Sequence, residues 1–217
     1  MQQKNITIPK TARYFILGEA SEKTEQIWFV CHGYGQLANY FLQNFNSLDD
    51  GKQLLIAPEG LHRFYWKEFS GRVVASWMTK EDRENDITDY INYLDMVYAE
   101  VLSSFKTNSK IKINVLGFSQ GTATVCRWVA NKRSRVDNLI LWAGSFPADM
   151  NFEKDKTLFD SINTFIVVGD KDEFINEEEI EKQILFLKNK EIKYELIRFK
   201  GKHAINEEVL LELQKRF

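Results

Sequence analysis

One stretch decides the fold of this chain: Ile113-Asn114-Val115-Leu116-Gly117-Phe118-Ser119-Gln120-Gly121. Its first four residues predict a buried β-strand, and the last five fit G-x-S-x-G, a sharp turn that presents a serine between a strand and a helix. A serine at the tip of such a turn has a strained backbone, and the flanking glycines keep side chains from crowding the strand and the helix. The residues Thr122 to Lys132 predict the required helix, whose N-terminal dipole favours negative charge near Ser119.

The G-x-S-x-G pattern alone is of moderate specificity, because glycine makes up about 7% of ordinary sequences and chance matches occur. The alternative is an ordinary strand-to-helix turn. The apolar strand before the pattern and the helix after it favour Ser119 as a nucleophile.

Short apolar runs alternate with helical stretches along the rest of the chain. Strands are expected at Ile27 to Cys31, Gln53 to Ala57, Lys112 to Leu116, Asn138 to Trp142, Thr164 to Val168 and Lys193 to Phe199, with an edge strand at Ala12 to Leu17. Helices are expected at Leu37 to Leu48, Asp86 to Phe105, Ser119 to Lys132, Glu177 to Lys190 and Ile205 to Phe217. This alternation predicts an α/β fold with a mostly parallel central sheet and helices on both faces. We expect a single domain over residues 1–217, with its chemistry in the loops at the carboxyl ends of the strands.

The composition excludes several classes of protein. A formal net charge of −2 without long runs of like charge argues against a nucleic-acid partner. No apolar stretch approaches the roughly 20 residues that span a bilayer, so no integral membrane association is expected, and the first residues lack a signal-peptide pattern, which favours a cytoplasmic location. The two cysteines, Cys31 and Cys126, lie in apolar contexts and are expected to be buried free thiols.

A second turn follows the strand Ile27 to Cys31: His32-Gly33-Tyr34-Gly35-Gln36. Two glycines around one residue let backbone N–H groups converge, as an oxyanion hole requires. We expect the N–H groups of Tyr34 and Gln120 to be the two donors. His32 is an alternative base, but its place inside the turn favours a structural hydrogen-bonding role.

Acids and a histidine follow the last two predicted strands. Gly169-Asp170-Lys171-Asp172 comes after one strand, and His203 comes after the next. The order Ser, Asp, His is the order in which this fold places a catalytic triad, and His203 alone among the three histidines lies downstream of both other members. Asp172 is favoured over Asp170 because it lies nearer the tip of its loop.

A stretch rich in aromatic residues, 61–78, follows the carboxyl end of a predicted strand and contains Trp66, Trp77 and Met78. Charged residues interleave with the aromatic ones, which favours a ligand groove over a purely internal surface. We expect these three residues to bind substrate. The alternative is that the stretch caps the sheet and packs on the core.

The sequence resembles the phospholipase/carboxylesterase family of α/β-hydrolases, which includes acyl-protein thioesterases. The likeness covers nearly the whole chain and rests on His32-Gly33-Tyr34-Gly35, Ala57-Pro58-Glu59, Trp77, Gly117-Phe118-Ser119-Gln120-Gly121, Gly169 with Asp172, and His203. The resemblance implies a Ser119, Asp172 and His203 triad with an oxyanion hole at Tyr34 and Gln120. The sequence departs from the family at Thr122, where a second glycine is usual, at Trp77-Met78-Thr79, and in the insertion-like stretch Leu61 to Arg72.

These features predict a serine hydrolase that cleaves small carboxylic esters or thioesters through an acyl-enzyme intermediate. Three scattered histidines offer no ligand cluster, so neither a metal nor an organic cofactor is expected. Two alternatives stay open: a ligand-binding protein of the same fold without turnover, and an acyltransferase or peptidase that uses the same triad. The sequence leaves the oligomeric state and the acyl length open.

Overall fold

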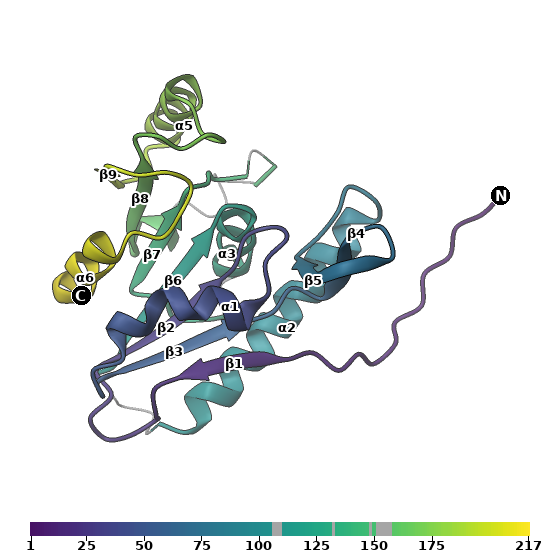
Figure 1. The fold of residues 1–217 in the computed structure, drawn as a ribbon, viewed down its shortest axis with the longest axis horizontal. Coiled ribbons are helices and arrows are strands. Elements are labelled where there is room, and N and C mark those ends of the chain that lie inside the picture. The colour runs from purple at the N-terminus through teal and green to yellow at the C-terminus, as the bar shows by residue number, and fades with distance from the viewer. Residues whose placement is uncertain (106–109, 132, 148, 151–157) are drawn as a thin grey trace.

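The computed structural model describes residues 1–105, 110–131, 133–147, 149–150 and 158–217. Its centre is a seven-stranded sheet in the order β1-β3-β2-β6-β7-β8-β9 (Figure 1). The strands are β1 (Tyr14–Leu17), β2 (Gln26–Cys31), β3 (Gln53–Pro58), β6 (Lys112–Phe118), β7 (Asn138–Trp142), β8 (Asn163–Gly169) and β9 (Glu195–Phe199). Only the edge strand β1 is antiparallel to its neighbour. The predicted α/β-hydrolase fold with a mostly parallel sheet is confirmed.

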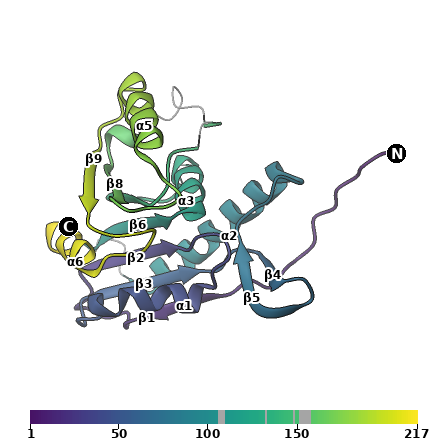
Figure 2. The same cartoon turned by 45° about the horizontal axis from the view of Figure 1, so that its top comes forward.

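Helices cover both faces of this sheet (Figure 2). The helices are α1 (Ala38–Leu42), which continues as a 3₁₀ helix (Gln43–Leu48), α2 (Arg83–Ser103), α3 (Gln120–Ala130), α5 (Glu177–Asn189) and α6 (Glu207–Arg216). Successive side chains of β2 point to opposite faces: Trp28 packs with α1 and α6, whereas Phe29 packs with α2 and α3. Because both faces are covered, every residue of β2 is buried, which explains why the inner strands read as continuous apolar runs.

The sequence did not predict the strands of one element, a hairpin formed by β4 (His62–Lys67) and β5 (Ser70–Ser76). The two strands form a separate two-stranded sheet with Tyr65 opposite Val73 and an irregular register near the turn. Glu68 and Gly71 adopt φ values of 45° and 89° in the turn region. The hairpin occupies most of the stretch 61–78, for which the sequence predicted a ligand groove without predicting strands.

Two further findings concern membranes and thiols. No helix in the described ranges is long and apolar enough to cross a membrane. Cys31 and Cys126 are buried and free, as predicted, and burial raises the pKa of both thiols. Neither is placed to act as a thiolate nucleophile.

Candidate active site

Ser119 lies at the sharp turn between β6 and α3. Its backbone has φ 53° and ψ −117°, outside the regions that residues with a Cβ normally adopt. Its N–H donates to the carbonyl oxygen of Trp142 at 2.9 Å, so the neighbouring strand β7 holds the strained turn in place. Such strain persists only where the surrounding structure enforces it.

The two glycines of the turn are required by close backbone approaches. A Cβ on Gly117 would collide with the carbonyl group of Gly121, and one on Gly121 would collide with the carbonyl oxygen of Cys31. The G-x-S-x-G pattern therefore brings β6, α3 and the end of β2 together around Ser119.

The missing side chain of Gly144 makes room for the side chain of Thr122 in the turn. The Thr122 hydroxyl donates to the carbonyl oxygen of Ser119 at 2.7 Å and lies 3.3 Å from that of Ser145. A Cβ on Gly144 would collide with the Thr122 side chain. The volume that Thr122 adds to the turn is thus accommodated by the missing side chain at position 144.

His203 pairs with Asp172, one of the two candidate acids. Its Nδ1 lies 2.8 Å from Asp172 Oδ2 and 3.0 Å from Oδ1, and the Asp172 side chain is fully buried. Asp172 Oδ1 also accepts the N–H groups of Phe174 and Ile175, which fix the carboxylate. Because an ionised carboxylate can only accept, Nδ1 of the ring carries the proton and Nε2 is left with a lone pair.

The rings of Phe118 and Phe174 pack on the same imidazole. Their centroids lie 4.9 and 4.7 Å from that of His203, and the His203 side chain is 13% exposed. These contacts restrict the ring to one orientation.

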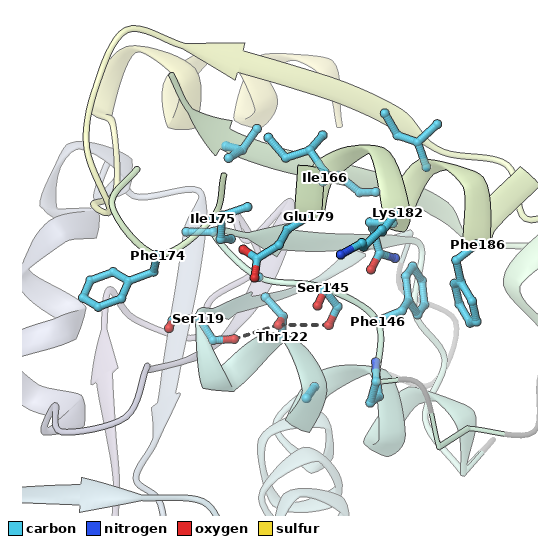
Figure 3. Close-up of a pocket in the computed structure, with 18 of the residues that line it drawn as sticks. Ser119, Thr122, Ser145, Phe146, Ile166, Phe174, Ile175, Glu179, Lys182 and Phe186 are labelled. Atoms are coloured by element: carbon cyan, nitrogen blue, oxygen red, sulfur yellow. Dashed lines mark hydrogen bonds between the residues drawn. The ribbon is translucent and has the colours of Figure 1, made fainter. Parts of the chain in front are cut away.

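Ser119 and His203 both line one cavity of about 800 Å³ between α3 and α5. That volume lies within the roughly 300–1,000 Å³ typical of small-molecule sites. Figure 3 shows Phe174 on the Ser119 side of the cavity, and Phe146 and Phe186 at its opposite end. Apolar side chains of β8 and α5, including Ile166 and Ile180, supply much of the wall.

Charged side chains also line the cavity, from the α3 side and from α5. Arg127 reaches it from α3 and donates to Asp149 at 2.9 Å, and Asp149 also pairs with Arg83. Burial by itself would raise the pKa of Asp149, but hydrogen bonds from the two arginines outweigh it and lower the pKa to about 2. Glu179 and Lys182 of α5 also line the cavity. The cavity therefore combines an apolar wall with a charged border.

The loop after β2 lies directly against Ser119. A Cβ on Gly33 would stand 3.2 Å from Ser119 Cβ, and the Gln36 side chain accepts the Gly33 N–H at 2.7 Å. Gly35 has φ 73°, and a Cβ there would collide with the ring of Trp66. The loop that carries Tyr34 is thus held at Ser119 on one side and at the hairpin on the other.

His32 is fully buried and has a structural place. Its Nε2 accepts the N–H of Gly60 at 3.0 Å, and its Nδ1 lies 2.7 Å from the carbonyl oxygen of Gly33. Burial lowers the pKa of His32 to about 4. Because both ring nitrogens are engaged, the ring has no free lone pair with which to act as a base, in agreement with the structural role favoured from the sequence.

Gln120 connects the serine turn to the base of the hairpin. Its Oε1 accepts the N–H of Trp77 at 3.2 Å, and its Nε2 donates to the carbonyl oxygen of Met78 at 3.1 Å. Its backbone N–H is the first of α3, before the intrahelical hydrogen bonds begin. That N–H is therefore not used by the helix.

The three residues predicted to bind substrate lie apart from the cavity walls identified in the described part of the chain. Trp77 is fully buried and donates to the carbonyl oxygen of His32 at 2.8 Å, and Met78 packs against the core. Trp66 is 44% exposed and contacts the Tyr34 ring at a centroid distance of 6.0 Å. Their contact with substrate stays a prediction.

Sequence reasoning did not single out the cavity walls on α5 and after β7. Residues of α5 such as Ile180 and Phe186 reach the cavity only because α5 packs over the sheet beside α3. The apolar spacing of α5 was the available signal, but it does not tell which apolar side chains border a cavity.

Comparisons with known proteins agree with the fold and identify the family. The family model described as Phospholipase/Carboxylesterase matches residues 13–216. Acyl-protein thioesterase 2 from Zea mays has a similar structure, with a TM-score of 0.69, 17% identity, and coverage of 95% of this chain and 97% of that chain. A Bacillus cereus carboxylesterase gives a TM-score of 0.64 at 14% identity and 95% coverage of both chains. No curated protein matches the sequence. At these identities the likeness to solved structures shows the fold alone.

Proposed function

Because the chain belongs to the phospholipase/carboxylesterase family of α/β-hydrolases, we propose that it hydrolyses small carboxylic esters or thioesters through Ser119, His203 and Asp172. One observation carries the proposal: Ser119 and His203 line the same cavity, and His203 is paired through Nδ1 with a buried carboxylate. This arrangement leaves His203 Nε2 as the proton acceptor that a serine nucleophile needs.

The reaction proceeds by two acyl transfers. Ser119 Oγ attacks the carbonyl carbon, its proton passes to His203 Nε2, and the C–O or C–S bond breaks as that proton moves to the leaving alcohol or thiol. Water, deprotonated by the same nitrogen, then attacks the acyl-enzyme and releases the acid. Asp172 holds the ring in the required tautomer and stabilises its protonated form.

The oxyanion of each tetrahedral intermediate accepts hydrogen bonds from the backbone N–H groups of Tyr34 and Gln120. The first position of α3 adds the positive end of the helix dipole, which stabilises the same charge. The contact of Gly33 with Ser119 supports this assignment, because it brings the Tyr34 loop next to the nucleophile.

The acyl chain occupies the cavity between α3 and α5. Arg127 stands eight positions after Ser119 on α3, about 12 Å along the helix axis. An extended chain zigzags, so each C–C bond of about 1.5 Å advances it by only about 1.3 Å, and roughly nine bonds cover that distance. Acyl groups of medium length therefore fill the apolar part of the cavity and end near its charged border.

Labelling with a fluorophosphonate tests the nucleophile. The parent protein should react rapidly, and Ser119→Ala should lose both labelling and hydrolysis of p-nitrophenyl butyrate and a butyryl thioester. Ser145→Ala is the matched control, because Ser145 lines the same cavity and should keep both activities. Labelling that persists in Ser119→Ala, or a protein that binds ester without cleaving it, contradicts the proposal.

A product analysis with added alcohol or thiol separates hydrolysis from acyl transfer. Free acid should be the main product. The single-domain organisation and the cytoplasmic location expected from the sequence stay predictions.

A further inference from the structure

Two buried nitrogen atoms in side chains that line the cavity have no hydrogen-bond partner among the described residues. They are Nε of Arg127, on α3, and Nε2 of Gln183, on α5. The Arg127 side chain is 9% exposed, and its other two nitrogens are used: one donates to Asp149 at 2.9 Å, and the other lies 3.4 Å from the Tyr90 hydroxyl. A buried donor without an acceptor costs free energy, so these two nitrogens indicate a place for an acceptor.

The two donors belong to the two helices that enclose the cavity. Arg127 lies eight positions after Ser119 on α3, and Gln183 lies in the middle of α5. The terminal amide of a glutamine turns about a torsion with broad preferences, so Nε2 of Gln183 can meet a ligand atom without a shift of α5. An oxygen atom in the cavity between α3 and α5 can thus accept from one or both nitrogens.

The charges that line the cavity decide which kind of oxygen fits. Asp149 accepts from both Arg127 and Arg83, and these hydrogen bonds lower its pKa to about 2, so its carboxylate stays ionised. Figure 3 shows the side chains of Glu179 and Lys182, which carry opposite charges, directed from α5 into the cavity. A carboxylate on the ligand would lie near those of Asp149 and Glu179 without a cation of its own. An uncharged oxygen needs only the two unpartnered nitrogens.

We propose that Arg127 and Gln183 form a subsite for an uncharged oxygen atom on the acyl chain, so that the preferred substrates are esters or thioesters of oxo or hydroxy acids. The inference rests on the proposed function, because it names the acyl group that the same site takes. Arg127 stands about 12 Å from Ser119 along the helix axis, which places the oxygen near the eighth carbon of an extended chain. An alkyl chain leaves both nitrogens without an acceptor, and a site with such unpaired groups rejects the analogue that lacks the partner atom.

Three p-nitrophenyl esters of equal chain length test the subsite: the nonanoate, the 8-oxononanoate and the monoester of nonanedioic acid. In the parent, kcat/KM for the 8-oxononanoate should at least equal that for the nonanoate, although an oxo group in a cavity without donors lowers the value by about tenfold. The nonanedioate should be the poorest of the three. Gln183→Leu keeps the size of the side chain and removes its donors. It should lower the ratio of the two kcat/KM values, 8-oxononanoate over nonanoate, by about tenfold.

Matched variants separate the subsite from general effects. Gln43→Leu makes the same change at an exposed glutamine that does not line the cavity, and it should keep the parent's ratio. Arg127→Lys keeps the charge but removes Nε, and it should lower the ratio in the same direction as Gln183→Leu. Thermal unfolding of each variant shows whether the fold is retained. Calorimetric binding of methyl 8-oxononanoate and methyl nonanoate to the Ser119→Ala protein makes the same comparison without turnover, and the oxo ester should bind at least as tightly.

Failure of the subsite and failure of the proposed hydrolysis are distinguishable. The parent's turnover of p-nitrophenyl acetate tests hydrolysis alone, because an acetyl group is too short to reach Arg127. If the parent turns over the acetate but prefers the nonanoate to the 8-oxononanoate by the same factor as Gln183→Leu does, the subsite is overturned. An equal change of the ratio in Gln43→Leu also overturns it. A nonanedioate that is cleaved faster than the 8-oxononanoate overturns the choice of an uncharged oxygen.

Discussion

Asp172 accepts a hydrogen bond from His203 Nδ1 at 2.8 Å, whereas Asp170, two residues earlier, accepts the backbone N–H of Gly201 at 2.9 Å. The two acids thus serve one loop in different ways. Asp170 closes the loop that carries His203, and Asp172 meets the imidazole itself.

This difference predicts unequal effects of two isosteric substitutions. Asp172→Asn should lower kcat by about 10³–10⁴-fold, because an amide can donate to Nδ1 and so favour the wrong tautomer of His203. Asp170→Asn should keep kcat within about tenfold, since an amide oxygen can still accept the Gly201 N–H. Steady-state kinetics on p-nitrophenyl butyrate measures both. Equal losses would remove the distinction between the two acids.

A bulky side chain one helical turn beyond Ser119 tests whether the acyl chain occupies the cavity. Ala123 lines the cavity, and Ala123→Phe should fill it next to the nucleophile. For esters of increasing acyl length, kcat/KM of the parent should rise by up to about fourfold with each added methylene until the cavity is full. The variant should lose that climb while it still turns over acetyl esters.

The same series of esters of increasing acyl length tests Trp66 and Trp77, which the sequence predicted to bind substrate. If Trp66→Ala or Trp77→Ala flattens the climb and Ala123→Phe does not, the acyl chain lies at the hairpin. Trp77→Ala should instead lower the melting temperature, because Trp77 is fully buried and packs on Tyr90. Thermal unfolding of each variant separates the two effects.

A ladder of amides joins the strands near their amino ends; Gln26, Asn114 and Asn138 are buried, and Asn163 is exposed. Asn163 donates to Asn138 at 2.9 Å, Asn138 to Asn114 at 2.7 Å, and Asn114 to Gln26 at 2.9 Å. Asn138→Ala leaves the buried Oδ1 of Asn114 without its donor and should cost about 1–3 kcal/mol of unfolding free energy. Urea denaturation measures the loss. Asn92→Ala, at an exposed position of α2, should change stability by no more than about 0.5 kcal/mol.

The lowered pKa of His32 predicts that the stability of the protein depends on pH. Its folded pKa is about 4 against an unfolded value of 6.5, so between these values the unfolded chain binds more protons than the folded protein. The contribution is fully present above pH 6.5 and is lost as the pH falls towards 4. Between pH 7 and pH 5 the unfolding free energy should fall by about 2 kcal/mol through this residue.

Urea denaturation of the parent and of His32→Gln at both pH values measures that contribution. The variant should be less stable at pH 7 but should lose less stability on acidification. Parallel losses in the two proteins would show that His32 is not the group responsible.

The amino-acid sequence by itself determined the strands of the main sheet and the turn at Ser119. The inner strands are buried on both faces, so each appears as an apolar run that needs no knowledge of its partners. The turn at Ser119 depends on residues two positions to either side, because their missing side chains permit the close approaches. Both the apolar runs and the glycines of the turn are patterns within a few consecutive residues.

The tertiary structure alone decided where the cavity lies and how the stretch 61–78 folds, and it pairs His203 with Asp172, the acid that the sequence favoured. Asp172 reaches His203 because β8 and β9 are neighbours, with Gly169 opposite Phe199, so that the loops after them adjoin. The cavity arises from α5 packing beside α3, and the hairpin is held by Gly35 and Gln36 of a distant loop. These features depend on contacts between segments far apart in the chain, and the pattern of residues within each segment does not specify its partner.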